Sequence, residues 1–202
     1  MSLIAIYGGS FDPIHNGHVT VINAITTIAS PDELLIFPSK VSPNKTSVIA
    51  SDSDRIEMIN LALSSINHGS TLIKIDPFEL TQPAPSYTIR TIRHLKNKYP
   101  ENTQLALVIG YDNYQHFHLW DDYEQVLTLL KQLLIVNRPG FEQRNAILEA
   151  HHHHKIKFIT TKEIPISSSQ IRQELSQKNP ISTHVPEAVR QYIYTQNLYQ
   201  TQ

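Results

Sequence analysis

The stretch YGGSFDPIHNGHVTVINAI, residues 7–25, connects an apolar run to a helical pattern through a loop with two glycines and two histidines. The run LIAIY at residues 3–7 just before it predicts a buried strand. Apolar residues at helical spacing over residues 18–29 predict a helix. A strand, a loop and a helix in this order form the opening unit of a parallel α/β sheet.

The same alternation continues along all 202 residues. Further strands are expected at 33–37, 71–75, 104–110, 132–137 and 155–160, and further helices at 51–65, 86–98, 122–131, 142–151, 168–178 and 186–196. We therefore expect an α/β fold, a Rossmann-like doubly wound parallel sheet with helices on both faces and a small C-terminal helical part at about 165–202. No linker or repeat divides the chain, so residues 1–202 are expected to form a single domain.

The spacing of apolar residues also predicts which helix faces are buried. The first helix should bury Val19, Ile22, Ile25 and Ile28. The second should begin at a cap of serines and aspartates near Ser51 and should bury Ile56, Ile59, Leu63 and Ile66.

Composition excludes several classes of protein. The 17 basic and 18 acidic residues give a formal net charge of −1, which argues against a nucleic-acid or membrane partner. There is no cysteine, and therefore no disulfide, thiolate metal site or cysteine nucleophile. No apolar run approaches the ~18 residues of a membrane span, and the N-terminus is too short and uncharged for a signal peptide. A cytoplasmic location is expected.

The loop of the opening stretch predicts a phosphate site. Gly8 and Gly9 allow a tight turn and a close backbone approach to a ligand, although neither a Walker loop nor Gly-x-Gly-x-x-Gly is present. His15 and His18 are three apart at an expected helix start, where backbone N–H groups favour an anion and both rings can face one ligand. Two other interpretations remain. With 11 histidines in the chain, two can lie three apart by chance. The pair could also bind zinc, but a third ligand nearby is lacking, which makes a zinc site a weak hypothesis.

The eleven residues from Gly8 to His18, Gly-Gly-Ser-Phe-Asp-Pro-Ile-His-Asn-Gly-His, resemble the signature of the nucleotidyltransferase superfamily that carries a His-x-Gly-His motif. The resemblance implies that His15 and His18 bind ATP phosphates and stabilise the transition state of adenylyl transfer. It also places Gly8, Gly9, Ser10 and Phe11 at the ATP. Asp12, the carboxylate of the signature, is left open between a metal-related role and positioning of the loop.

Over essentially its full length the chain resembles the bacterial nicotinate-nucleotide adenylyltransferases. The loop at residues 38–45 resembles the family loop after the second strand, and Lys45 would reach the triphosphate, although Asn44 stands where the family usually has His. Residues 166–172, Ile-Ser-Ser-Ser-Gln-Ile-Arg, resemble a second family motif. It would place Ser168 and Arg172 at the ATP phosphates.

Two further segments resemble the part of the family that holds the nicotinate nucleotide. Residues 84–91 match a Pro-Ser-Tyr-Thr helix start, where Ser86 can cap the helix, and the Thr88 side chain and the Ile89 N–H would meet the pyridine carboxylate. Gly110 and Asp112 match Gly-x-Asp, with the carboxylate on the ribose. Trp120, the single tryptophan, would stack on the pyridine ring.

The resemblance implies adenylyl transfer from ATP, with Mg²⁺, to nicotinate mononucleotide in NAD biosynthesis. A pantetheine phosphate enzyme would be shorter and would lack Ser-Tyr-Thr with Gly-x-Asp and Trp. A non-catalytic nucleotide-binding module and a class I aminoacyl-tRNA synthetase fragment are two further hypotheses. The run His151–His154 is interpreted as solvated rather than metal-binding, and a homo-oligomer remains open.

Overall fold

The sheet of the computed structural model, which describes residues 2–43, 46–137, 145–162 and 165–200, is wholly parallel in these ranges. Its strand order is β3-β2-β1-β4-β5-β6. Each strand was predicted, with bounds that differ by no more than two residues. The strands are β1 (Leu3–Gly9), β2 (Glu33–Pro38), β3 (Leu72–Ile75), β4 (Gln104–Gly110), β5 (Gln132–Asn137) and β6 (Ile156–Thr160).

The long helices also follow the predicted pattern. Short helical turns went unpredicted because a single turn has no measurable periodicity: they are α3 (Phe78–Thr81), α5 (Tyr111–Gln115), η2 (Phe117–Leu119) and η3 (His153–Lys155). The others are α1 (Asn16–Ala24), η1 (Ile25–Ala29), α2 (Asp52–Leu63), α4 (Thr88–Lys98), α6 (Tyr123–Leu129), α7 (Ala146–His152), α8 (Ser168–Ser176) and α9 (Glu187–Thr195). The helix expected at 142–151 partly falls outside the described residues.

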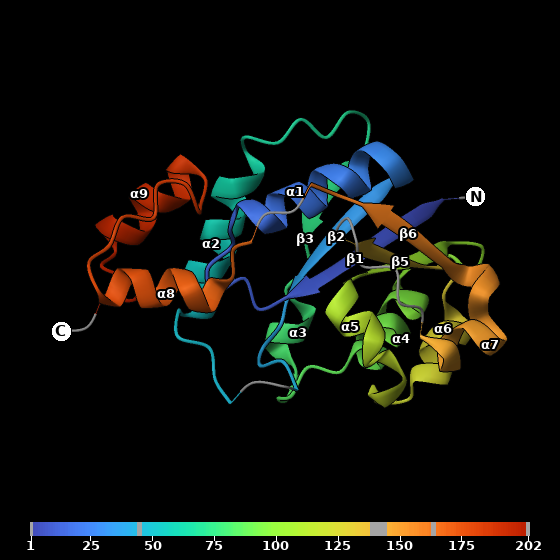
Figure 1. Ribbon diagram of the computed structural model, residues 1–202. Coiled ribbons are helices and arrows are strands. Elements are labelled where there is room, and N and C mark those ends of the chain that lie inside the picture. The colour runs from blue at the N-terminus through green and yellow to red at the C-terminus, as the bar shows by residue number, and fades with distance from the viewer. Residues whose placement is uncertain (1, 44–45, 138–144, 163–164, 201–202) are drawn as a thin grey trace.

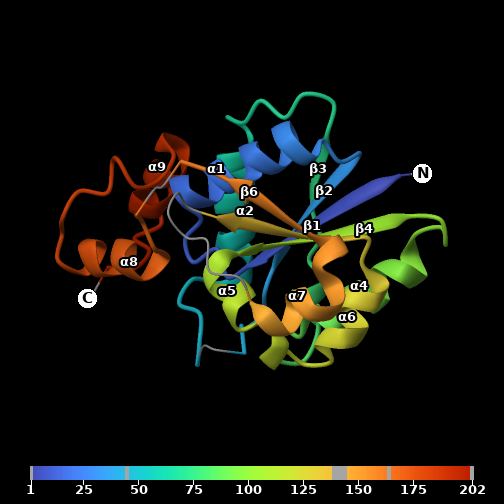
Figure 2. The same ribbon diagram turned by 45° about the vertical axis from the view of Figure 1, so that its right-hand side comes forward.

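Helices cover both faces of the sheet, which confirms the doubly wound architecture (Figure 1). One core packs the sheet against α1, α2, α8 and α9, and the other packs it against α4, α5, α6 and α7. Figures 1 and 2 both place α8 and α9 beyond the carboxyl end of β1, beside α2. Strand β4 is buried from Leu105 to Ile109, as expected for a strand covered on both faces.

The predicted buried faces of the first two helices were partly wrong. Ile28 is 49% exposed because residues 25–29 form a π-helix, whose wider turn rotates the side chains out of the α-helical phase. In α2, Ile56 and Leu63 are only partly buried, while Ile59 is buried as predicted, as is Ile66, which lies just after the end of α2. The face of α2 that is fully buried also carries Arg55, a residue that hydropathy assigns to the surface.

The strand order creates a crevice at the carboxyl ends of the two central strands, β1 and β4. The connection that leaves β1 runs toward β2 on one side, and the connection that leaves β4 runs toward β5 on the other side, so the carboxyl ends of β1 and β4 form a topological switch point. Open α/β sheets bind ligands at such a point. The histidine loop follows β1 and Gly110 ends β4, so the fold brings the two segments to the same crevice.

Candidate active site

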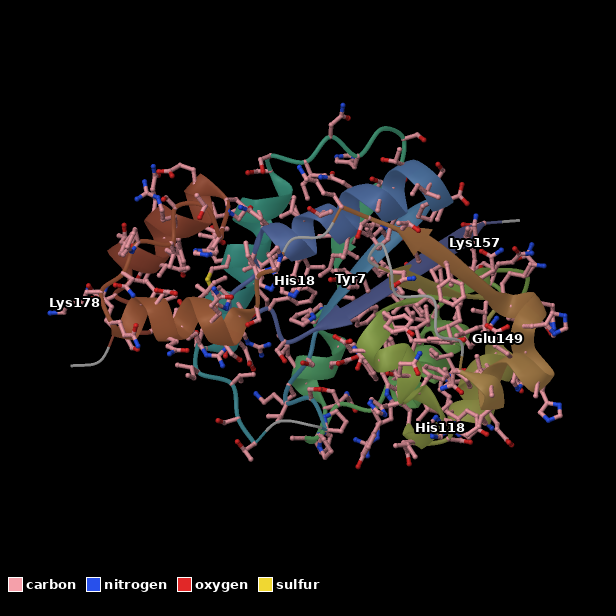
Figure 3. All side chains as sticks on the ribbon, viewed as in Figure 1. Tyr7, His18, His118, Glu149, Lys157 and Lys178 are labelled. Carbon is pink, nitrogen blue, oxygen red and sulfur yellow. The ribbon has the colours of Figure 1, made fainter. Side chains whose placement is uncertain are left out.

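A cleft lies at this switch point. It is lined by residues of β1, β4 and β5, of the start of α1 and of the segment after β6. Four of the predicted site residues, His15, His18, Gly110 and Asp112, line it. Figure 3 shows His18 beside Tyr7 at the carboxyl end of β1. The lining residues are Tyr7, His15, Gly17, His18, Thr20, Val21, Gly110, Tyr111, Asp112, Val136, Thr161, Lys162 and Ile166.

The two histidines of the loop pack against each other at the start of α1. Their ring centroids are 3.7 Å apart, and the backbone N–H of His15 donates to Nδ1 of His18 at 3.2 Å. With Nδ1 acting as an acceptor, the neutral His18 ring carries its proton on Nε2. The capping contact therefore fixes the tautomer in which Nε2 is a donor.

His15 is held as a neutral ring. It is 7% exposed, and burial, followed by repulsion from His184, lowers its pKa from 6.5 to about 4. Its buried Nδ1 has no hydrogen-bond partner among the described residues. A neutral imidazole can still donate one hydrogen bond to a phosphate, but it does not bring a positive charge.

The glycines of the signature do not form the expected tight turn. Gly8 and Gly9 both lie in β1, and a Cβ atom on Gly9 would lie 3.0 Å from the Phe11 ring. The chain turns at Phe11 itself, which has a φ of 47°, and its buried ring meets that of His18 edge-on at 5.0 Å. With its ring in the core, Phe11 can offer a nucleotide only its backbone.

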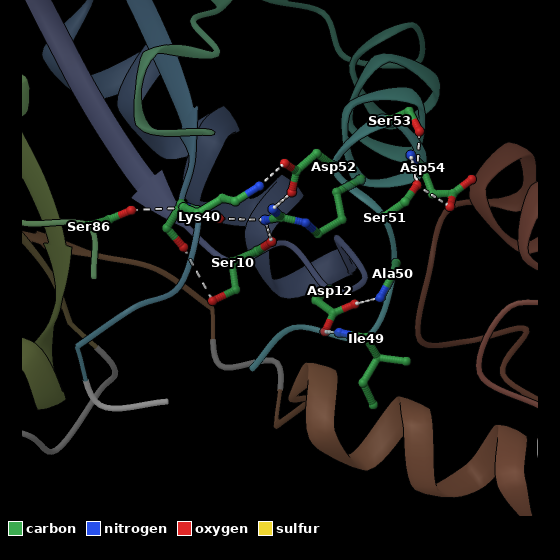
Figure 4. Close-up of polar contacts among 12 residues, drawn as sticks. Ser10, Asp12, Lys40, Ile49, Ala50, Ser51, Asp52, Ser53, Asp54 and Ser86 are labelled. Atoms are coloured by element: carbon green, nitrogen blue, oxygen red, sulfur yellow. Dashed lines mark hydrogen bonds and ion pairs between the residues drawn. The ribbon is translucent and has the colours of Figure 1, made fainter. Parts of the chain in front are cut away.

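Arg55 connects α2 to the loops that follow β1 and β2. Its side chain is fully buried, and Nη1 donates to the backbone oxygens of Ser10 at 2.7 Å and Ser39 at 2.8 Å. Asp52 accepts from Arg55 and, at 2.6 Å, from Lys40 (Figure 4). The sequence did not single out Arg55, and its only signal was the acidic cluster just before it.

The carboxylate of Asp12 is engaged in positioning the loop. It is 2% exposed, and its two oxygens accept the backbone N–H groups of Ile49 at 2.9 Å and Ala50 at 3.0 Å (Figure 4). These contacts tie the signature loop to the segment that leads into α2. Of the two roles left open by the sequence, the contacts favour positioning.

The second predicted phosphate motif lies against the signature loop. Ser168 Oγ donates to the backbone oxygen of Pro13 at 2.9 Å, and Arg172 Nη1 donates to that of Asp12 at 2.6 Å. Arg172 Nη2 donates to Ser169 Oγ at 3.3 Å. The fold thus brings the two motifs together although Pro13 and Ser168 are 155 residues apart.

The residues predicted for the pyridine lie outside the lining of the cleft just described. Ile89 is 1% exposed, and Thr88 is the first residue of α4. Trp120 is half-buried against Phe117, with centroids 4.8 Å apart. Ser86 does not cap α4 as expected, because its hydroxyl accepts the backbone N–H of Lys40 at 2.9 Å.

Some predicted residues lie where the structure gives no description, and some lining residues were not predicted. Asn44 and Lys45 lie outside the described residues. Thr161 and Lys162, which line the cleft after β6, were not predicted, because nothing in the sequence separates them from an ordinary strand end. Among the residues that the structure describes, no group of three histidines, cysteines or carboxylates is placed to hold a metal, and no helix is long and apolar enough to cross a membrane.

The fold and the cleft define the class of this protein. The model of the cytidylyltransferase-like family matches residues 6–174, from β1 through the histidine loop to α8. Within that class the chain belongs to the nicotinate-nucleotide adenylyltransferase family. It is 33% identical over 202 residues to the nicotinate-nucleotide adenylyltransferase of Bacillus subtilis (strain 168), and the match covers 100% of both chains.

Solved structures show the same fold. The Plasmodium falciparum nicotinic acid mononucleotide adenylyltransferase complexed with NaAD is 23% identical and has a TM-score of 0.80, with 98% of each chain covered. The same enzyme complexed with APC is 24% identical and has a TM-score of 0.74, with 98% of each chain covered.

Proposed function

We propose that this chain transfers the adenylyl group of ATP to nicotinate mononucleotide, giving nicotinate adenine dinucleotide and pyrophosphate as a step of NAD biosynthesis. The observation that carries the proposal is the pair His15 and His18, which line the cleft at the switch point in a chain that belongs to this family. A phosphate oxygen of the mononucleotide forms a bond to the α-phosphorus of ATP as the bond from that phosphorus to pyrophosphate breaks.

The catalytic task is positioning and charge stabilisation, because the attacking phosphate is already an anion. His18 donates from Nε2 to the α-phosphate in the transition state, and His15 lies beside it as a neutral donor. The backbone of residues 8–11 contacts the same nucleotide. Lys45, Ser168 and Arg172 hold the outer phosphates, where Arg172 is already oriented by the backbone oxygen of Asp12.

The acceptor occupies the other side of the switch point. Asp112 receives hydrogen bonds from ribose hydroxyls beside Gly110, both of which line the cleft. The start of α4, with the Thr88 side chain and the Ile89 N–H, meets the pyridine carboxylate, because the first N–H groups of a helix have no partner within it. Trp120 stacks on the ring.

Mg²⁺ would come with ATP and would neutralise charge on the triphosphate. Mg²⁺ keeps several waters and is usually held by nucleotide phosphates with one or two carboxylates. Both oxygens of Asp12 already accept backbone N–H groups, so this carboxylate is not available as a ligand. The metal would therefore be held by the phosphates of the nucleotide and by water. We further propose that residues 1–202 act as one domain.

Pyrophosphate release with ATP and Mg²⁺ tests the function. The acceptors to compare are nicotinate mononucleotide, nicotinamide mononucleotide and 4′-phosphopantetheine. We expect release chiefly with the nicotinate substrate. Equal or faster release with phosphopantetheine would overturn the acceptor assignment, and ATP binding without release for any acceptor would favour a binding module.

A further inference from the structure

The carboxylate of Asp12 is shared by segments from opposite ends of the chain. Besides the N–H groups of residues 49 and 50, its Oδ1 accepts the hydroxyl of Tyr199 at 2.8 Å. Arg172 Nη1, which donates to the backbone oxygen of Asp12, lies 3.8 Å from Oδ2. The signature loop is therefore held at Asp12 by the C-terminal tail and by α8 together.

Tyr199 reaches this carboxylate through a turn after α9. The N–H of Leu198 donates to the backbone oxygen of Ile193 at 3.0 Å, which folds the tail back toward the helix. Tyr199 has a φ of 64°, in the left-handed region that bulky residues rarely adopt. Such a conformation persists only where the surroundings hold it in place. The ring packs against the same core as α1 and α2.

The hydroxyl of Tyr199 is a neutral donor among charged groups. Burial, followed by the charge of Asp12, raises the pKa of Tyr199 well above its usual range, while Arg172 and Arg55 act in the opposite direction. The hydroxyl therefore keeps its proton and can donate to Asp12 throughout the neutral range. It anchors the carboxylate without adding a charge next to the arginine proposed for ATP.

We propose that Tyr199 is a positioning residue for ATP: its hydroxyl fixes Asp12, and Asp12 in turn sets the loop that carries His15 and orients Arg172. The inference deepens the proposed function, on which it rests for the identity of the nucleotide. The same site takes nicotinate mononucleotide on the other side of the switch point, so only the ATP half depends on this contact.

A matched pair of variants tests the proposal. Tyr199→Phe removes only the hydroxyl that bonds Asp12. Tyr192→Phe removes the same kind of bond, a tyrosine hydroxyl on Asp54 Oδ1 at 2.9 Å, from a tyrosine that is also half-buried against the same core but lies on α9. The readouts are ATP affinity by titration calorimetry, the KM for each substrate, kcat, and the unfolding temperature.

We expect Tyr199→Phe to weaken ATP binding by up to about tenfold, because Asp12 loses the hydroxyl that fixes it, and a hydrogen bond to a charged group stabilises a local arrangement by at least about that factor. The KM for nicotinate mononucleotide should stay unchanged, and Tyr192→Phe should bind both substrates like the unchanged protein. Equal ATP affinity in the two variants, or an equal rise in KM for both substrates in Tyr199→Phe, would overturn the proposal. If the unchanged protein binds ATP but releases no pyrophosphate, the proposed function fails while the affinity comparison still decides the role of Tyr199. If it binds no ATP, both fail.

Discussion

His15 and His18 have different environments although they share the first turn of one helix. His18 accepts a backbone N–H on Nδ1, which sets its tautomer, and it lines the cleft. His15 is almost fully buried, and its pKa is lowered to about 4. We therefore expect His18 to act mainly on the transition state, whereas His15 should also affect stability.

The first prediction at this scale concerns His18→Ala. Loss of one donor to the transition state typically lowers kcat by ~10²–10³. We expect a fall of at least about 10² in kcat for pyrophosphate release, in a protein that stays folded. A near-normal kcat would contradict the assignment of His18.

The second prediction concerns the pH dependence of stability. Because the pKa of His15 falls from 6.5 to about 4 on folding, the unfolded chain binds a proton between these pH values that the folded chain does not. The free energy of unfolding should therefore decrease as the pH is lowered from about 6.5 to about 4, by up to about 3 kcal/mol from this residue.

Urea unfolding at a series of pH values measures this effect. In His15→Gln the decrease over that window should be smaller than in the unchanged protein. His116→Gln, which removes an exposed histidine, serves as the control. The same pH slope in His15→Gln and the unchanged protein would show that the ring does not resist protonation in the fold.

At the scale of elements, α2 fastens the loops that surround the cleft. It presents Arg55 to the backbone oxygens of Ser10 and Ser39, so one side chain joins the ends of β1 and β2. The segment before α2 also provides the N–H groups that hold Asp12. A neighbouring helix thus braces the phosphate loop, and the loop's own sequence does not provide that bracing.

We expect Arg55→Met to lower the free energy of unfolding by at least about 2 kcal/mol, because two buried carbonyl groups and Asp52 lose their donor. Arg93→Met is the matched control. Its arginine side chain is 52% exposed and paired with Asp122, so its removal should cost no more than about 1 kcal/mol. Equal losses in chemical denaturation would contradict the bracing role.

At the scale of the whole molecule, the two halves of the proposed site rest on opposite faces of the sheet. The histidine loop and α8 pack on the core with α1 and α2, whereas Ile89 and Trp120 belong to the core with α4 to α7. The switch point between β1 and β4 is where these halves meet. One fold can therefore bring a nucleoside triphosphate and a mononucleotide together, while a different hydrophobic core supports each half of the site.

This separation predicts the behaviour of the single tryptophan. We expect nicotinate mononucleotide to quench the fluorescence of Trp120, because the pyridine ring stacks on the indole. ATP alone should leave the emission nearly unchanged. His18→Ala should keep the quenching, since it changes only the ATP half. Quenching by ATP and none by the mononucleotide would reverse the assignment of the two halves.

The local sequence determined the strands, the long helices and the family. Apolar runs such as residues 104–110 define strands whatever their partners, and eleven consecutive residues from Gly8 to His18 carry the signature. These features depend on side chains that are neighbours along the chain, so a period or a motif reports them. The short turns and the π-helix at residues 25–29 have too few residues for a period to reveal them.

Only the tertiary structure decided how the loop is held. Asp12 meets Tyr199 across 187 residues, and Arg55 becomes a buried brace because two backbone oxygens face it once β1 and β2 have paired. Ser86 resembled a helix cap in the sequence, but its hydroxyl accepts an N–H from the loop after β2. In each case the hydrogen-bond partner of a polar group comes from a distant segment of the chain. A buried polar atom is stable only when it has such a partner. No local pattern of residues encodes which distant partner it will meet.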